Sequence, residues 1–290
     1  MNKTNKKILI LSLAVIAISA VLLLAIFHKP AEPAPAPGEN TPEPVKTVTA
    51  GEYYDWNEKK FRENEAVNPD YIGTLRFESG LIDQPIVQGE TNDTYLRTDW
   101  KTGDYALGGT CFLDYRIHYK KDGDTPEDHN TVIYGHYMYP EYDPERNQMF
   151  TPLHVLRDKD NYEENKYIAL LLEDEVRRYQ VASVYLCSLE YDEAYKDYVY
   201  TKDEQQYYLE NFTPEYLEAY KDAINVSVND PGLDIDQEGT GYDAEFTGID
   251  FDADDSILTL QTCVLNRPDL RLIVVAKEID RLQFDQAMKQ

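Results

Sequence analysis

Three residues carry side chains suited to acyl transfer, and each adjoins a run that is typical of a β-strand: Cys263, His136 and Arg271. Apolar and polar residues alternate over 257–263, so the Cys263 thiol is expected on the polar face at a strand end. His136 follows a β-branched run and a glycine, where an imidazole can act as acid or base. Arg271 opens the last apolar run, and its guanidinium suits a developing oxyanion. Together they form a nucleophile, a proton carrier and an anion stabiliser.

Arg267, which lies in the loop between Cys263 and Arg271, is the alternative anion stabiliser. Arg271 is preferred because it adjoins the apolar run 272–276, whereas Arg267 precedes Pro268 and is expected in the turn itself. Residues beside the thiol and the imidazole are expected to contact a substrate: Gln261, Thr262 and Tyr137.

An acidic segment approaches the carboxylate spacing of an EF-hand calcium loop. The carboxylates concerned are Asp234, Asp236, Glu238 and Glu245. The segment departs from that pattern by a glutamate at the fifth position, by Gly241 where an apolar residue is usual, and by Pro231-Gly232 where a helix should precede it. A calcium site and a solvated acidic loop both remain as interpretations, and the departures favour the loop.

Cys111 and Cys187 lie inside apolar strand-like runs. Each is interpreted as a small core residue, and a disulfide between them is the alternative, since sequence does not supply the Cα separation that such a bond requires. With three cysteines in the chain, at least one thiol stays free in a monomer.

The elements that must position these residues are mainly strands. Eight runs rich in β-branched and aromatic residues are predicted as strands: Ile72–Phe77, Pro85–Gln88, Thr110–Asp114, Thr131–Tyr134, Tyr167–Leu172, Arg177–Leu189, Ile257–Thr262 and Leu272–Ala276. The predicted fold is therefore mainly β, a closed eight-stranded barrel that leaves no open edge.

Helices are predicted at the periphery of this barrel. Residues 52–64 set Trp56 and Phe61 among charged residues, which predicts an amphipathic helix over one barrel mouth. Between the sixth and seventh strands, a capping box at Thr201–Glu204 and the pair Thr213-Pro214 predict a helical insertion.

The first 50 residues differ from the rest. Lysines in residues 1–7 precede an uncharged run, 8–27, which at about 1.5 Å per residue can cross a hydrocarbon core of about 30 Å. We therefore expect a cytoplasmic N-terminus, a single-pass anchor in the cell membrane and an exported remainder; a signal peptide cleaved near Ser19-Ala20 is the alternative. Six prolines in 28–50 predict a spacer or a disordered tether, and 51–290 is predicted as one catalytic domain.

The chain has a formal charge of −26, from 54 acidic and 28 basic residues. Residues 1–50 carry a small positive excess, so the acidity belongs to 51–290. A polyanion lacks the electrostatic footprint that phosphate backbones require, which excludes nucleic acid as a partner.

The motifs resemble those of the sortases, membrane-anchored cysteine transpeptidases of Gram-positive bacteria. Thr259–Cys263 is similar to the TLxTC signature of that family, Tyr134–His136 to its histidine strand, and Arg271 to its arginine. Four further segments are similar, in order, to class B: 68–73, 82–88, 112–116 and 130–136. Class B members often have Ser at the position of Gln261 and Asn at that of Tyr137, so this chain departs from the pattern at two expected substrate contacts.

The resemblance implies cleavage of an NPxTG- or NPxTN-like sorting motif after its Thr, through a thioacyl intermediate on Cys263. The implied partners are secreted proteins with a C-terminal sorting signal, a peptidoglycan precursor or cross-bridge amine, and the membrane through residues 8–27. No cofactor is expected. A pilin lysine as acceptor, a hydrolytic cysteine protease, and an inactive surface-tethered binding or scaffold module remain as alternatives.

Overall fold

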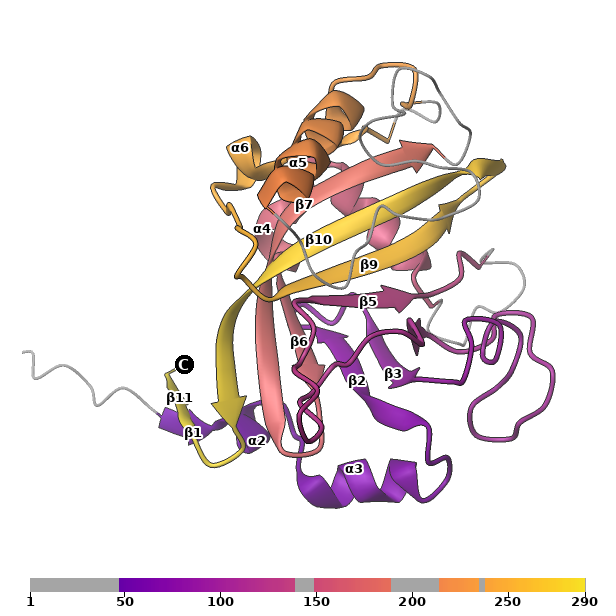
Figure 1. The fold of residues 1–290 in the computed structure, drawn as a ribbon, viewed down its shortest axis with the longest axis vertical. Coiled ribbons are helices and arrows are strands. Elements are labelled where there is room, and N and C mark those ends of the chain that lie inside the picture. The colour runs from indigo at the N-terminus through magenta and orange to yellow at the C-terminus, as the bar shows by residue number, and fades with distance from the viewer. Residues whose placement is uncertain (1–46, 139–148, 189–213, 235–237, 290) are drawn as a thin grey trace, which may run out of the picture. The chain divides into compact units, whose positions relative to one another are not determined.

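A barrel of eight strands forms the centre of the part of the chain that the structure describes (Figure 1). The computed structural model describes residues 47–138, 149–188, 214–234 and 238–289. Around the barrel the strands are β10 (Arg267–Gln283), β9 (Ile257–Val264), β5 (Asn130–Tyr134), β4 (Phe112–Leu113), β3 (Asp83–Val87), β2 (Tyr71–Phe77), β6 (Tyr167–Leu171) and β7 (Glu175–Ser188). Strand β7 pairs again with β10, which closes the barrel and confirms the predicted fold class.

The barrel interior is filled by the apolar faces of these strands. In β9, Leu258 and Leu260 are fully buried, and in β10 the buried run is Leu272–Ala276. Strand β10 extends well beyond the run predicted for it, because it pairs with β7 as far as Gln283, through two register shifts. Its second half is polar, so hydrophobic periodicity gave no signal for it.

Three further strands were not predicted. Strand β8 (Gly241–Tyr242) adds to the edge of β7, and β1 (Thr47–Thr49) pairs with β11 (Ala287–Lys289) in a separate two-stranded sheet. Each has only two or three residues, too few for a period-two pattern to be recognised.

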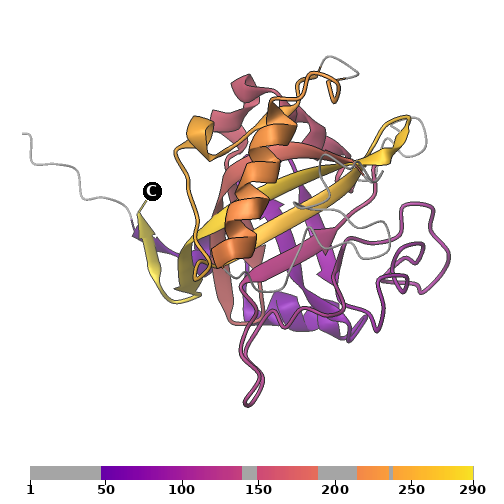
Figure 2. The same cartoon turned by 45° about the horizontal axis from the view of Figure 1, so that its top comes forward.

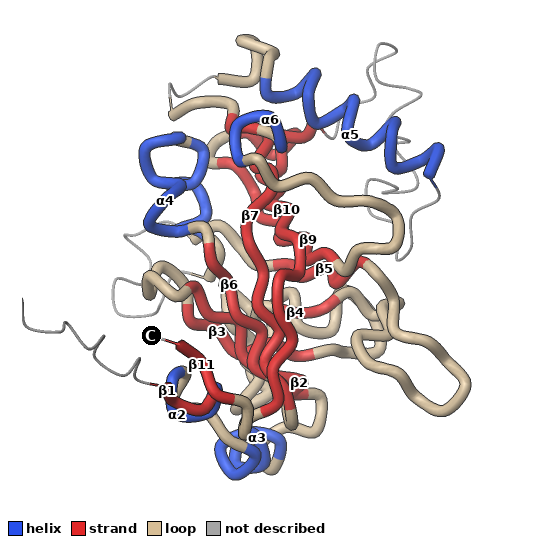
Figure 3. Tube along the Cα trace, turned by 90° about the vertical axis from the view of Figure 1, so that its left-hand side faces the viewer, coloured by secondary structure: helices blue, strands red, loops and turns tan. Residues whose placement is uncertain are grey.

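The predicted N-terminal helix is broken into two. Helix α2 (Ala50–Tyr53) begins with a capping box on its N-cap residue, Thr49. Helix α3 (Glu58–Glu65) begins after Asn57, whose Oδ1 accepts from the Lys60 N–H. Between them Asp55 has a φ of 49°, which a continuous helix does not allow. Figure 3 shows α2 and α3 at one end of the strands and α4 (Tyr162–Asn165), α5 (Pro214–Val228) and α6 (Ala244–Thr247) at the other.

The helical insertion lies between β7 and β9, as predicted. Helix α5 starts at Pro214 and packs against β7 (Figure 2), while the predicted capping box at 201–204 and Thr213 lie outside the described residues. A 3-10 helix, η1 (Thr151–Arg157), contacts both β7 and β10 and is followed by a second, η2 (Lys159–Asn161).

A cluster of charges, here called the Glu127 network, joins a loop to the two longest strands. The Glu127 carboxylate accepts from Arg177 Nη1 at 2.8 Å and from Arg281 Nη1 and Nη2 at 2.9 and 2.8 Å. Glu175 pairs with Arg177 at 2.7 Å and Glu278 with Arg281 at 2.8 Å. The Arg177 side chain is 1% exposed, so its charge depends on these carboxylates rather than on water.

The prediction of a single-pass membrane protein is corrected. Within the described ranges no helix is both long and apolar enough to cross a bilayer. The longest helix in the described ranges, α5, has 15 residues and is about 22 Å long, which is less than the thickness of a hydrocarbon core, about 30 Å. The expected span, residues 8–27, lies outside the described residues.

Candidate active site

Cys263, His136 and Arg271 line one cavity of about 280 Å³. The other residues that line it are Leu96, Phe112, Tyr134, Gly135, Gln261 and Thr262. The structure therefore brings together the three residues that the sequence singled out.

Strand register explains why they meet. Strands β5 and β9 are parallel neighbours with Tyr134 opposite Gln261, so His136 and Cys263, each two residues further on, reach the same level. Strands β9 and β10 are antiparallel with Cys263 opposite Arg271, and paired residues point to the same face of a sheet. Three strands thus deliver one reactive group each to one end of the sheet.

The His136 ring is held by a backbone carbonyl. Its Nε2 lies 2.9 Å from the Leu96 oxygen, and because a carbonyl only accepts, Nε2 carries the hydrogen. In the neutral ring Nδ1 is then the nitrogen that can take a proton. Burial lowers the pKa of His136 from its usual value; the Leu96 carbonyl opposes this, while Arg97 and Arg271 add to the lowering. The free protein thus holds a neutral imidazole ready to act as base near neutral pH.

Burial alternates along the end of β9. Gln261 and Cys263 are partly exposed on the cavity side, whereas Thr262 is 1% exposed and faces the interior. The Thr262 hydroxyl has no hydrogen-bond partner among the described residues and is not accessible to a substrate. The Thr262 hydroxyl lies on the opposite face of the strand from the nucleophile, but Thr262 lines the cavity, so its contact with substrate stays a prediction.

Tyr137, also expected to contact substrate, is not among the residues that line the cavity. It forms an isolated bridge with Met149, and its ring packs edge to face on His154 with centroids 4.9 Å apart. A contact between Tyr137 and substrate stays a prediction.

The two candidate arginines have different partners. Arg271 lines the cavity, and its Nη1 donates to the carbonyls of Pro268 and Leu270 at 2.9 and 2.8 Å. Arg267 is not among the lining residues, and its Nε donates to the Asp269 carboxylate at 2.8 Å. This geometry favours Arg271, as the sequence did.

Two groups at the site were not identified from the sequence. The Leu96 carbonyl comes from a loop with no strand pattern, and His154 in η1 places Nε2 2.9 Å from the Cys263 carbonyl oxygen. His154 carried no signal, since a lone histidine in a short amphipathic run is more often structural.

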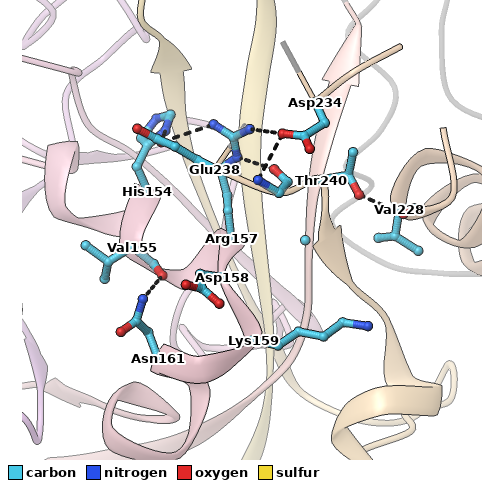
Figure 4. A pocket seen from close by; sticks show the side chains of 12 residues that line it. His154, Val155, Arg157, Asp158, Lys159, Asn161, Val228, Asp234, Glu238 and Thr240 are labelled. Carbon is cyan, nitrogen blue, oxygen red and sulfur yellow. Dashed lines mark hydrogen bonds and ion pairs between the residues drawn. The ribbon is translucent and has the colours of Figure 1, made fainter. Parts of the chain in front are cut away.

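A buried arginine lies beside two carboxylates of the segment that was considered as a calcium loop. Arg157 Nη1 lies 3.3 Å from a Glu238 oxygen and Nη2 lies 3.8 Å from an Asp234 oxygen (Figure 4). Its Nε donates to the Gly239 carbonyl at 2.7 Å, and its side chain is fully buried. Within the described residues no group of metal-ligating side chains is placed to hold an ion. The guanidinium therefore supplies positive charge beside these two carboxylates.

The other two residues of the considered calcium loop lie apart from this pair. Glu245 belongs to α6, and Asp236 lies outside the described residues.

The alternative of a Cys111–Cys187 disulfide is wrong, because all three thiols are free. Cys111 is fully buried, and Cys187 is opposite Arg271 on the side of β10 away from Cys263. Burial raises the pKa of Cys111, and raises that of Cys187 to about 12 although Arg271 opposes it. Both thiols are therefore protonated at neutral pH and serve as core residues.

Comparison with known proteins identifies the family. The sortase domain model matches residues 76–279. Sortase B of Staphylococcus aureus is 26% identical over 76% of this chain and 75% of its own length, and sortase B of Listeria monocytogenes is 34% identical over 41% of this chain and 42% of its own. The solved structure of a mutant form of Clostridium perfringens sortase B has a TM-score of 0.57 and 26% identity, covering 77% of this chain and 87% of that one. The chain therefore belongs to the sortase family of cysteine transpeptidases, in class B.

Proposed function

We propose that this protein cleaves a sorting motif similar to NPxTG or NPxTN after its Thr and joins the Thr carboxyl to an amine of the cell wall. The observation that carries the proposal is the single cavity into which β5, β9 and β10 deliver the imidazole, the thiol and the guanidinium. Class B membership supports a sorting signal as substrate.

In the first half of the reaction His136 Nδ1 takes the proton of Cys263, and the thiolate attacks the Thr carbonyl carbon. Charge develops on the carbonyl oxygen, and Arg271 stabilises it through guanidinium N–H groups other than those that serve Pro268 and Leu270. The peptide C–N bond breaks, and His136 returns its proton to the leaving amine. A thioacyl enzyme remains.

In the second half an acceptor amine attacks the thioester carbonyl and gives a proton to His136 Nδ1. The C–S bond breaks, a new amide forms, and the proton returns to the Cys263 sulfur. The neutral state that burial favours for His136 suits the step that accepts a proton from each nucleophile. The acceptor proposed is the amine of a peptidoglycan stem peptide or cross-bridge, and a pilin lysine is the second candidate.

The test is a panel of peptides that contain NPxTG or NPxTN, incubated with and without triglycine and analysed by mass spectrometry. Triglycine is the probe because a sortase B of the same fold was solved in complex with this tripeptide. Wild type should release the fragment that follows Thr and form a Thr–triglycine amide, and Cys263→Ala should form neither. Identical product profiles for the two would overturn the proposal and favour an inactive binding module. Hydrolysis without amide formation would favour a cysteine protease.

A further inference from the structure

The pairing of β9 with β5 ends before it reaches Cys263, so the Cys263 carbonyl receives no hydrogen bond from β5. The Gly135 N–H donates to the Gln261 carbonyl at 3.1 Å, and carbonyls two residues apart on a strand face the same way. The next donor of a continued parallel ladder would be the N–H of Tyr137. However, β5 ends at Tyr134, and Tyr137 lies opposite Met149 instead. The divergence of β5 from β9 that opens the cavity also takes this ladder donor away from the nucleophile's own carbonyl.

His154 takes the place of the missing ladder donor. Its Nε2 lies 2.9 Å from the Cys263 oxygen, and because that oxygen only accepts, Nε2 carries the hydrogen. The His154 side chain is only 10% exposed, so water competes weakly for this bond. The Tyr137 ring packs on one side of the imidazole, and a Glu238 oxygen lies 4.0 Å from Nδ1 (Figure 4). The Cys263 carbonyl, which has no ladder donor from β5, is thus satisfied by a side chain that its own neighbours hold in place.

The same segment also holds the His136 end of the site. The Phe150 N–H, just before η1, donates to the His136 carbonyl at 3.1 Å. Within η1, the Thr151 hydroxyl accepts from the Met138 N–H at 2.6 Å and donates to the Met138 carbonyl at 3.0 Å. One short piece of chain therefore bonds to the backbone beside the imidazole and to the backbone of the thiol.

We infer that His154 is a positioning residue for the transpeptidation described above. Its hydrogen bond fixes the Cys263 main chain relative to His136, where β5 no longer pairs with β9. This inference rests on the proposed function. It assigns His154 no contact with substrate. Its effect is to hold the nucleophile in the geometry for attack, so its loss lowers kcat and leaves KM unchanged.

Two substitutions separate the donor from mere packing. In His154→Gln the amide nitrogen lies as many bonds from Cα as the imidazole Nε2 and can donate to the same carbonyl. In His154→Asn the amide nitrogen falls one bond short. Val155→Ala, in the same turn of η1, is the matched control because Val155 is 40% exposed. Each variant is assayed with the peptide panel and triglycine, and its thermal midpoint is measured.

We expect kcat to fall about tenfold in His154→Asn, the equivalent of one lost hydrogen bond, with KM within about twofold of wild type. His154→Gln should recover most of kcat, and Val155→Ala should match wild type. Equal kcat in His154→Asn and wild type would overturn the inference. So would an equal kcat loss in His154→Gln and His154→Asn, because a purely structural role would not distinguish the two amides.

A second readout does not depend on turnover. Alkylation by iodoacetamide, followed by peptide mass spectrometry at Cys263, should slow in His154→Asn and recover in His154→Gln, because the sulfur moves with its main chain. If no peptide reacts with wild type, the proposed function fails, and the alkylation rates still test His154. Equal alkylation rates in wild type, Asn and Gln variants would overturn the positioning role by themselves.

Discussion

Gly135 is the residue whose substitution tests the site geometry most directly. A Cβ added there would lie 2.5 and 2.7 Å from two ring atoms of Phe150 and 2.9 Å from the Cys111 sulfur. Ordinary carbon contacts are about 3.5–4.0 Å, so the ring or the backbone must shift by about 1 Å. Phe150 is fully buried, and His136 is the residue that follows Gly135 in the chain.

Gly135→Ala should therefore cost about 1–3 kcal/mol of folding free energy, as overpacking of a close-packed core does. For a domain of this size that lowers the thermal midpoint by roughly 2–4 °C per kcal/mol. The catalytic cost should be larger, since a displacement of about 1 Å at His136 lowers kcat about 100-fold. Both are measured on purified protein, by thermal unfolding and by the peptide–triglycine assay.

A double-mutant cycle supplies the control. Phe150→Leu removes ring atoms that the new Cβ would meet, so Gly135→Ala in that background should lose less stability and less kcat than in wild type. The expected coupling is at least about 1 kcal/mol. Additive effects, or a kcat in Gly135→Ala close to wild type, would refute the view that the Gly135–Phe150 contact sets the position of His136.

The remaining predictions concern charges. Glu127→Gln should lower the free energy of unfolding, measured in urea, by about 2–3 kcal/mol. The loss should be smaller than for a fully buried ion pair, because Glu175 and Glu278 remain beside the two arginines. An unfolding free energy equal to that of wild type would contradict this. Because the pKa of folded His136 is depressed, the unfolded chain binds a proton first on acidification, so stability should fall as pH drops below about 6.5. His136→Gln should show a smaller fall in thermal midpoint between pH 7 and 5, and identical slopes would count against it. Arg271→Lys should lower kcat about 100-fold or more, whereas Arg267→Lys should change it less than threefold; the reverse order would make Arg267 the anion stabiliser.

The parts predictable from sequence were those encoded locally. Period-two alternation in 257–263 gave both the strand and the face on which Cys263 lies, and the run before His136 gave a strand that ends beside it. The parallel pairing of these strands was not visible in the residues, yet two reactive groups at strand ends were enough to suggest one site.

The features that escaped prediction arise from non-local contacts. His154 can bond to the Cys263 carbonyl because the pairing of β5 with β9 ends at Tyr134. The hydrophobic pattern of neither strand indicates where this pairing ends. In the same way, the spacing of Asp234 and Glu238 gave no sign of Arg157, which reaches them from a distant part of the chain. The break at Asp55 depends on a positive φ that hydrophobic periodicity does not report.

The double pairing of β10 has a consequence for how the chain folds. This strand lies between β7 and β9 and follows both of them in the sequence, so the barrel stays open until β10 has been synthesised. Until then the edges of β7 and β9 are unpaired and can join other chains. A truncation that removes β10 should leave both edges exposed and yield aggregates rather than a smaller folded protein. Arg271 is carried by β10 and is paired with Cys263, so the anion stabiliser joins the nucleophile only when the barrel closes.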